Sequence, residues 1–189
     1  MSSVSSPFGI RPSFKSGGLV DSTPLAHDIA SAYNTNIFQG APVKIGTNGT
    51  LELAANSDRM VGVFEGCYYI PQTGRPVWDN KWIASTVLAA GTVCVAYYTR
   101  DPQLTYEVQA NGSLTLANMG DQMNLTVTTA GNATTGLSSA ALDTASSGAN
   151  AGFRIVGLTP APDNDWGDAF TIVQVQISKH QDVADIAAY

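Results

Sequence analysis

Short apolar runs separated by turn residues dominate this chain, most clearly over residues 40–66. Val, Ile and Leu in such runs, with Asn and Gly between them, are typical of strands joined by tight turns. The Asn48-Gly49 pair fits a type I′ turn, which needs positive φ at both central residues, so residues 44–53 are predicted to form a hairpin. Three runs make up this predicted meander, at residues 42–45, 51–55 and 60–64.

The same pattern predicts strands along the rest of the chain. In the last run, Val173, Val175 and Ile177 share one face, whereas Phe170 and Ile172 fall on the other, which indicates a bulge or a strand buried on both faces. The predicted fold class is therefore all-β, a small β-barrel with meander strands, long loops and at most one or two short helices. The further predicted strands cover residues 93–98, 104–108, 114–116, 123–128, 153–158 and 170–177.

Two segments depart from the strand pattern. Residues 23–33 are the best helix candidate, because Thr23 can cap, Pro24 suits the first turn, and Leu25 and Ile29 share a face; the alternative is an irregular loop. The tract 129–152 is rich in Ala, Ser, Thr, Gly and Asn. It is predicted to be either a long exposed excursion or poorly ordered, because it has little apolar surface to bury.

This reading divides the chain into three parts. Residues 1–22 are predicted to be a flexible N-terminal arm, because the first residues are rich in Ser. Residues 23–180 form the β-rich domain, either as one unit or as two sub-domains at about 23–118 and 119–180. Residues 181–189 form a C-terminal tail.

Composition narrows the classes of function. The 189 residues are 44% hydrophobic and 13% charged, which is ordinary for a folded protein. Nine Lys and Arg against fifteen Asp and Glu give a net charge of −6, which argues against direct nucleic-acid binding. No run approaches the roughly 20 apolar residues of a membrane span, and no leader pattern opens the chain, so synthesis in the cytoplasm without a membrane partner is expected. Cys67 and Cys94 are expected to be buried free thiols rather than a disulfide.

Motifs of catalysis, cofactor binding or metal binding do not stand out. The sequence has two histidines, His27 and His180, in unrelated positions, and it has no phosphate loop or nucleophile elbow. Asp163, Asp165 and Asp168 form an acidic cluster, but its Gly and later positions do not follow an EF-hand loop. The sequence therefore predicts no catalytic residue, no cofactor and no metal ligand.

Two segments combine aromatic residues with cations and are candidates for a protein interface. The first contains Phe8, Arg11, Phe14 and Lys15. It is either an edge segment packed on its own domain or an arm that reaches a neighbouring subunit or a shell below, where aromatic and Arg residues are favoured anchors.

The second segment contains Arg75, Trp78 and Trp82. Either the two Trp rings plug the end of a barrel, or they form an exposed aromatic and cationic platform for a protein or sugar partner.

Several of these motifs carry a resemblance to a known family. The order Gly-Ala-Pro-Val-Lys, turn, Asn-Gly-Thr, apolar strand, Asn-Ser-Asp and Val-Gly-Val-Phe-Glu-Gly-Cys resembles the head decoration (cement) proteins of tailed bacteriophages. The similarity extends roughly over residues 40–179. Further motifs that carry it are Thr-Gly-Arg-Pro-Val-Trp, at residues 73–78, and Asp-Asn-Asp-Trp-Gly-Asp, at residues 163–168.

The resemblance implies a β-tulip-like or related domain without enzymatic activity. It implies a location on the capsid exterior, the major capsid protein as partner, and self-association as a homotrimer in preference to a dimer. The expected role is to stabilise the expanded shell. The alternative is a carbohydrate-binding or adhesion module that stacks sugars on aromatic side chains, namely Trp78, Trp82, the pair Tyr68-Tyr69 and the pair Tyr97-Tyr98.

Overall fold

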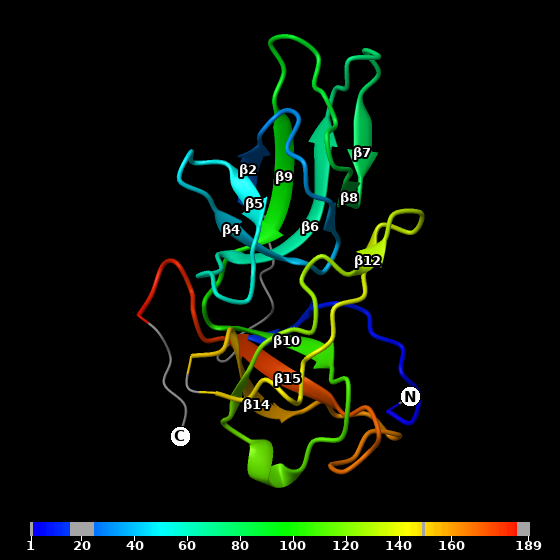
Figure 1. The fold of residues 1–189 in the computed structure, drawn as a ribbon, viewed down its shortest axis with the longest axis vertical. Helices are drawn as coiled ribbons and strands as arrows, with labels where there is room; N and C mark the ends of the chain where they lie inside the picture. The colour runs from blue at the N-terminus through cyan, green and yellow to red at the C-terminus, as the bar shows by residue number, and fades with distance from the viewer. Residues whose placement is uncertain (1, 16–24, 149, 185–189) are drawn as a thin grey trace.

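Two large antiparallel sheets, one above the other along the long axis of the molecule, make up most of the fold, with two smaller strand pairs beside them (Figure 1). The computed structural model describes residues 2–15, 25–148 and 150–184. Over these ranges the regular structure is β-strand apart from one short 3-10 helix, so the all-β prediction is confirmed. The described strands form open sheets rather than a closed barrel, which corrects that part of the expectation.

The upper sheet has the strand order β2-β9-β6-β4-β5, with β7 paired to β6. One of its faces covers the first hydrophobic core, which includes Phe64, Trp82 and Tyr98. A separate pair, β3 and β8, lies beside it. The strands are β2 (Leu25–Ile29), β3 (Ile37–Phe38), β4 (Pro42–Ile45), β5 (Leu51–Leu53), β6 (Gly62–Tyr69), β7 (Val77–Asp79), β8 (Lys81–Trp82) and β9 (Cys94–Thr99).

The lower sheet has the order β1-β10-β15-β14-β11 and covers the second core, which includes Tyr106, Phe153 and Val175. The chain passes from the upper to the lower sheet between β9 and β10, rather than near residue 118 as the sequence pattern suggested. The elements are β1 (Arg11–Lys15), β10 (Leu104–Gln109), η1 (Leu116–Asn118), β11 (Gln122–Met123), β14 (Phe153–Leu158) and β15 (Ile172–Ile177), with a small hairpin of β12 (Gly131–Asn132) and β13 (Leu137–Ser138).

The predicted central hairpin is confirmed, but its turn is longer than predicted. Val43 lies opposite Leu53 and Ile45 opposite Leu51, which leaves residues 46–50 as the loop. Gly49 has a φ of 73°, whereas Asn48 does not take a positive φ, so the type I′ assignment is wrong. The register that buries Val43 and Leu51 sets the loop length.

The helix predicted over residues 23–33 is wrong, because β2 occupies Leu25–Ile29. Its backbone pairs with β9 along its whole length, from Leu25 opposite Tyr98 to Ile29 opposite Cys94. A segment this short has little helical stability of its own, so pairing with a neighbouring strand decides its conformation. Thr23 and Pro24, the expected start of the helix, lie outside the described residues.

The strands predicted at 153–158 and 170–177 are confirmed as β14 and β15, whereas two others are not. Residues 114–116 lead into η1, and of 123–128 only the first residue belongs to a strand, β11. For residues 170–177 the sequence left open a bulge or a strand buried on both faces. In β15 buried and half-buried residues alternate, and the bulge lies in its partner β14, where the register shifts between Ile155 and Gly157.

Part of the tract 129–152 is packed into the fold. Leu142 is fully buried and forms isolated bridges with Ala110 and Leu125, and Ala140 is buried beside it. The expected exposure or disorder is therefore wrong for residues 140–142, whereas residues 131–135 are exposed. Small residues let the segment pack closely against the lower core, so composition alone understated its burial.

Truncation of Leu142 tests this placement. Leu142→Ala should lower the free energy of unfolding by about 2 kcal/mol or more, because it opens a cavity in a closed core. Leu137→Ala is the matched control, since Leu137 is 43% exposed and should cost about 0.5 kcal/mol. Urea unfolding followed by fluorescence measures both; equal small losses would place Leu142 outside the core.

Residues 2–15, which the sequence assigned to a flexible arm, lie against the lower sheet. The buried Ser2 donates its hydroxyl to Asp168 and accepts, through its carbonyl, the backbone N–H of Phe170. Gln109 donates its amide to the carbonyl of Val4, and β1 pairs with β10. The first part of the expected arm is therefore a built-in edge of the lower sheet. Residues 16–22 of that expected arm lie outside the described residues.

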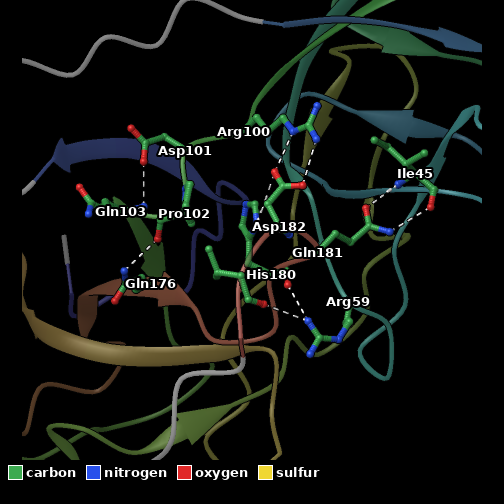
Figure 2. Close-up of polar contacts among 11 residues, drawn as sticks. Ile45, Arg59, Arg100, Asp101, Pro102, Gln103, Gln176, His180, Gln181 and Asp182 are labelled. Atoms are coloured by element: carbon green, nitrogen blue, oxygen red, sulfur yellow. Dashed lines mark hydrogen bonds and ion pairs between the residues drawn. The ribbon is translucent and has the colours of Figure 1, made fainter.

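The segment after β15 fastens the lower sheet to the upper one (Figure 2). Backbone hydrogen bonds link Met60 with Lys179 and Gln181, and the Gln181 side chain both accepts from and donates to the backbone of Ile45. Arg100 forms two hydrogen bonds, of 2.8 and 2.9 Å, with the Asp182 carboxylate. These contacts fix the two sheets relative to one another.

His180 lies buried within this segment and makes folding sensitive to acid. Its Nδ1 accepts the backbone N–H of Asp182, and its Nε2 finds no hydrogen-bond partner among the described residues. Burial lowers the pKa of His180 below its ordinary value, and the carboxylate of Asp182 only partly opposes this. As the pH falls through about 6.5, the unfolded chain therefore takes up a proton on this imidazole more readily than the folded chain does.

Stability should accordingly decrease from neutral pH toward acid in part because of His180. The measurement is the urea concentration at the midpoint of unfolding, determined at several pH values from 7.5 to 5. It is made for the wild-type protein and for His180→Gln, whose side chain does not titrate. We expect the pH slope to be shallower in the variant, whatever its stability at neutral pH. Identical slopes would show that His180 does not resist protonation.

Candidate interaction surface

The structure separates the two tryptophans that the sequence grouped together. Trp82 is fully buried in the upper core, where its indole N–H donates to the carbonyl of Tyr33 and its ring meets Tyr69 edge-on. Trp78, four residues earlier, is 68% exposed. Trp82 is therefore a core residue, and its assignment to an interface is wrong, whereas Trp78 remains a surface candidate.

Trp78 is the centre of an aromatic cluster on the outer face of the upper sheet. It lies opposite Tyr68 in the β6–β7 pair, with ring centroids 4.7 Å apart. It also stacks on Tyr97 of β9, at 5.6 Å between centroids and 10° between ring planes. Strand alternation explains the arrangement, because Tyr69 and Tyr98, the other members of the two Tyr pairs, point into the core. We call Tyr68, Trp78 and Tyr97 the aromatic cluster.

A hollow of about 530 Å³ opens beside this cluster. Gly66 lines it on β6, between the strands that carry Trp78 and Tyr97. Without a side chain at Gly66, the space above the central strand stays open. The other lining residues are Glu65, Cys67, Asp79 and Asn80.

Glu65 reaches this hollow because of a β-bulge. The register between β6 and β9 shifts between Phe64 and Gly66, which leaves Glu65 as the extra residue. A bulge of this kind redirects a side chain relative to the sheet. Burial raises the pKa of Glu65, and a long contact of 3.4 Å from the Gln39 amide only partly offsets it. The carboxylate is thus poorly solvated and weakly satisfied.

Glu65 also lines a second hollow, of about 230 Å³, formed largely by the N-terminal segment. Two interface candidates, Phe8 and Arg11, lie here, with the Arg11 guanidinium 4.3 Å from the centroid of the Phe8 ring. The side chains of Phe14 and Lys15 lie outside the described part of the structure. Phe8 and Arg11 thus share a neighbour, Glu65, with the hollow beside the aromatic cluster, which the sequence did not suggest.

Arg75 is exposed in the turn between β6 and β7, the hairpin that also carries Trp78. Gly74, which precedes it, has a φ of 80°, which suits this tight turn. The sequence grouped Arg75 with Trp78, and the structure places both in this hairpin. The sequence reasoning missed Glu65 as a site residue, because the bulge that redirects its side chain depends on pairing with a strand about thirty residues away in the sequence.

The other groups with potential chemistry have structural roles. Cys67 and Cys94 are buried free thiols, as expected, and contact with Cys94 together with burial raises the pKa of the Cys67 thiol. Asp168 accepts hydrogen bonds from Ser2 and from the backbone N–H of Asp165. Within the described ranges, no three His, Cys, Asp or Glu side chains gather to hold a metal ion.

Comparisons with known proteins indicate neither a family nor a function for this chain. No protein-family model, curated protein or solved structure matches this chain. None of the described helices has the length and apolar character needed to cross a membrane.

Proposed function

We propose that this protein is a virion structural protein that binds the outer surface of a phage capsid and stabilises the expanded shell. The proposal draws first on the resemblance to the decoration proteins of tailed phages over residues 40–179. The structural observation that supports it best is the exposed Trp78, held on the outer face of a rigid sheet by Tyr68 and Tyr97. Fixed, exposed aromatic side chains of this kind are the usual anchors of protein interfaces.

The fold supports a role that depends on shape. Two sheets locked together by the segment after β15 give a stiff body that can bridge neighbouring coat subunits across a seam. Bridging of this kind adds interface area without a chemical step. On this proposal the coat protein is the main partner, and the protein associates with itself on the shell, as a trimer in preference to a dimer.

Co-sedimentation with capsids tests the proposal. The probe is empty heads assembled from the major coat protein of a phage whose genome encodes this chain, in expanded and in immature form. We expect the protein to sediment with expanded heads and to remain in solution with immature ones. Trp78→Ala should weaken binding to expanded heads while leaving the protein folded. Equal binding to both forms, or to neither, would contradict the proposed function.

Carbohydrate binding is the second candidate, and the same aromatic cluster favours it. A flat, exposed indole such as Trp78 can stack on a sugar ring. Of the aromatic residues first considered for this role, Trp82, Tyr69 and Tyr98 are buried, which leaves only the aromatic cluster. Glycan-array binding that disappears in Trp78→Ala would favour this candidate over capsid binding.

A further inference from the structure

The charged side chains that line the hollow beside the aromatic cluster are all negative. Its walls include the rings of Trp78 and Tyr97, and its charged side chains are the carboxylates of Glu65 and Asp79. A volume of about 530 Å³ falls within the range of small-ligand sites, about 300–1,000 Å³. Aromatic faces attract cations, and carboxylates accept hydrogen bonds from them. The hollow therefore favours a guest that is cationic and rich in donors.

Apart from the indole N–H of Trp78 and the hydroxyl of Tyr97, which line the hollow, the side-chain donors beside it are already engaged. The amide of Asn80 donates to the carbonyl of Thr135 at 3.0 Å, and Lys81, next in the chain, lies 3.7 Å from Asp79 and contacts the carbonyl of Thr134. A sugar needs donors as well as acceptors from its site, whereas a guanidinium needs only acceptors. The non-aromatic side chains of the lining with free hydrogen-bonding capacity are thus acceptors, Glu65 and Asp79, which suit an arginine side chain better than a sugar hydroxyl group.

Glu65 is the strongest acceptor available. Its carboxylate is largely withdrawn from solvent, and among the described residues only the Gln39 amide, at 3.4 Å, donates to it. Asp79 is partly neutralised by Lys81. Glu65 also lines the second hollow, where a cation, Arg11, already lies over the ring of Phe8. The described lining of the hollow beside Trp78 has no cationic residue, so this hollow is the one that can accept a cation from outside.

We propose that this hollow binds the side chain of an arginine from a partner polypeptide, with the guanidinium against the Trp78 ring and hydrogen-bonded to Glu65. The planar fork of a guanidinium can stack on an indole and pair with a carboxylate at the same time, which an ammonium group does less well. The net charge of −6 gives a long-range attraction for a basic loop. This inference deepens the proposed function and rests on it only for the identity of the partner, the coat protein.

An NMR titration of the full-length protein with small probes tests the inference without capsids. The probes are Nα-acetyl-arginine amide and its neutral isostere, Nα-acetyl-citrulline amide. We expect saturable shifts of the Trp78 indole N–H and of the Gly66 amide with arginine, and none with citrulline at equal concentration. Glu65→Gln should weaken arginine binding by about tenfold, since it removes the charge-assisted acceptor.

Glu52→Gln is the matched control, because it removes the same charge from β5, whose Glu52 does not line the hollow, and should leave the affinity unchanged. Equal shifts with citrulline, shifts that never saturate, or equal losses in both variants would overturn the inference. A saturable response to an oligosaccharide but not to arginine would also overturn it. If the protein binds arginine but not expanded heads, the proposed function is contradicted and the arginine site is supported. If the protein binds expanded heads but not arginine, only the arginine site is contradicted.

Discussion

Gly62→Ala should prevent stable folding, with a loss of about 4 kcal/mol or more in the free energy of unfolding. An added Cβ at Gly62 would lie 1.5 Å from the carbonyl oxygen of Thr99. That oxygen belongs to the backbone of β9, so no side chain can move aside to make room. Gly62 opens β6, and the neighbouring pair joins Val63 to Thr99, so the clash would separate the two central strands of the upper sheet.

Gly157→Ala is the control for this substitution. Gly157 also lies in a strand, β14, but its added Cβ would meet only the flexible end of Gln174, at an ordinary 3.6 Å. We expect a change within about 1 kcal/mol. Circular dichroism and thermal unfolding compare the two variants. A folded Gly62→Ala protein with near wild-type stability would mean that β6 and β9 are not paired as described.

Trp82→Ala should cost about 3–5 kcal/mol, whereas Trp78→Ala should cost about 1 kcal/mol. Trp82 is fully buried, and its removal leaves a large cavity and takes one hydrogen bond from the carbonyl of Tyr33, which keeps the bond from the backbone N–H of Ser85. Trp78 loses only its contacts with Tyr68 and Tyr97 on an open face. Chemical unfolding of both variants gives the two values, and binding to expanded heads gives the functional comparison.

The pair of variants distinguishes core from surface. We expect Trp78→Ala to remain folded and to lose affinity for its partner, and Trp82→Ala to lose stability first. The opposite ranking of stabilities would place Trp82 on the surface and Trp78 in the core. Similar binding by the wild-type protein and by Trp78→Ala would remove the aromatic cluster from the interface.

Local patterns in the sequence predicted the strands that pair with near neighbours in the chain. The hairpin of β4 and β5 follows from short apolar runs and the Asn-Gly pair, β14 from a further short apolar run, and β15 from alternation over its six residues. The helix predicted over residues 23–33 failed because a strand about seventy residues later pairs with this segment. No pattern within a short stretch of sequence indicates pairing between strands this far apart in the chain.

The candidate surface was only partly predictable for the same reason. A loop with Trp78 and Trp82 is an evident feature of the sequence, but their opposite environments depend on β7 pairing with β6 and β8 pairing with β3. Tyr97 and Glu65 join Trp78 only through the order of strands β9, β6 and β7 in the sheet. The sequence thus indicated the anchor, and the sheet determined its neighbours.

Electron cryomicroscopy of purified particles tests the account most directly. Expanded heads assembled from the coat protein of a phage that encodes this chain, once mixed with this protein, should show added density on the outside of the shell. The face that carries Trp78 should be turned toward a basic segment of the coat protein. Particles without added density, or a protein found inside the shell or absent from purified virions, would contradict the proposal.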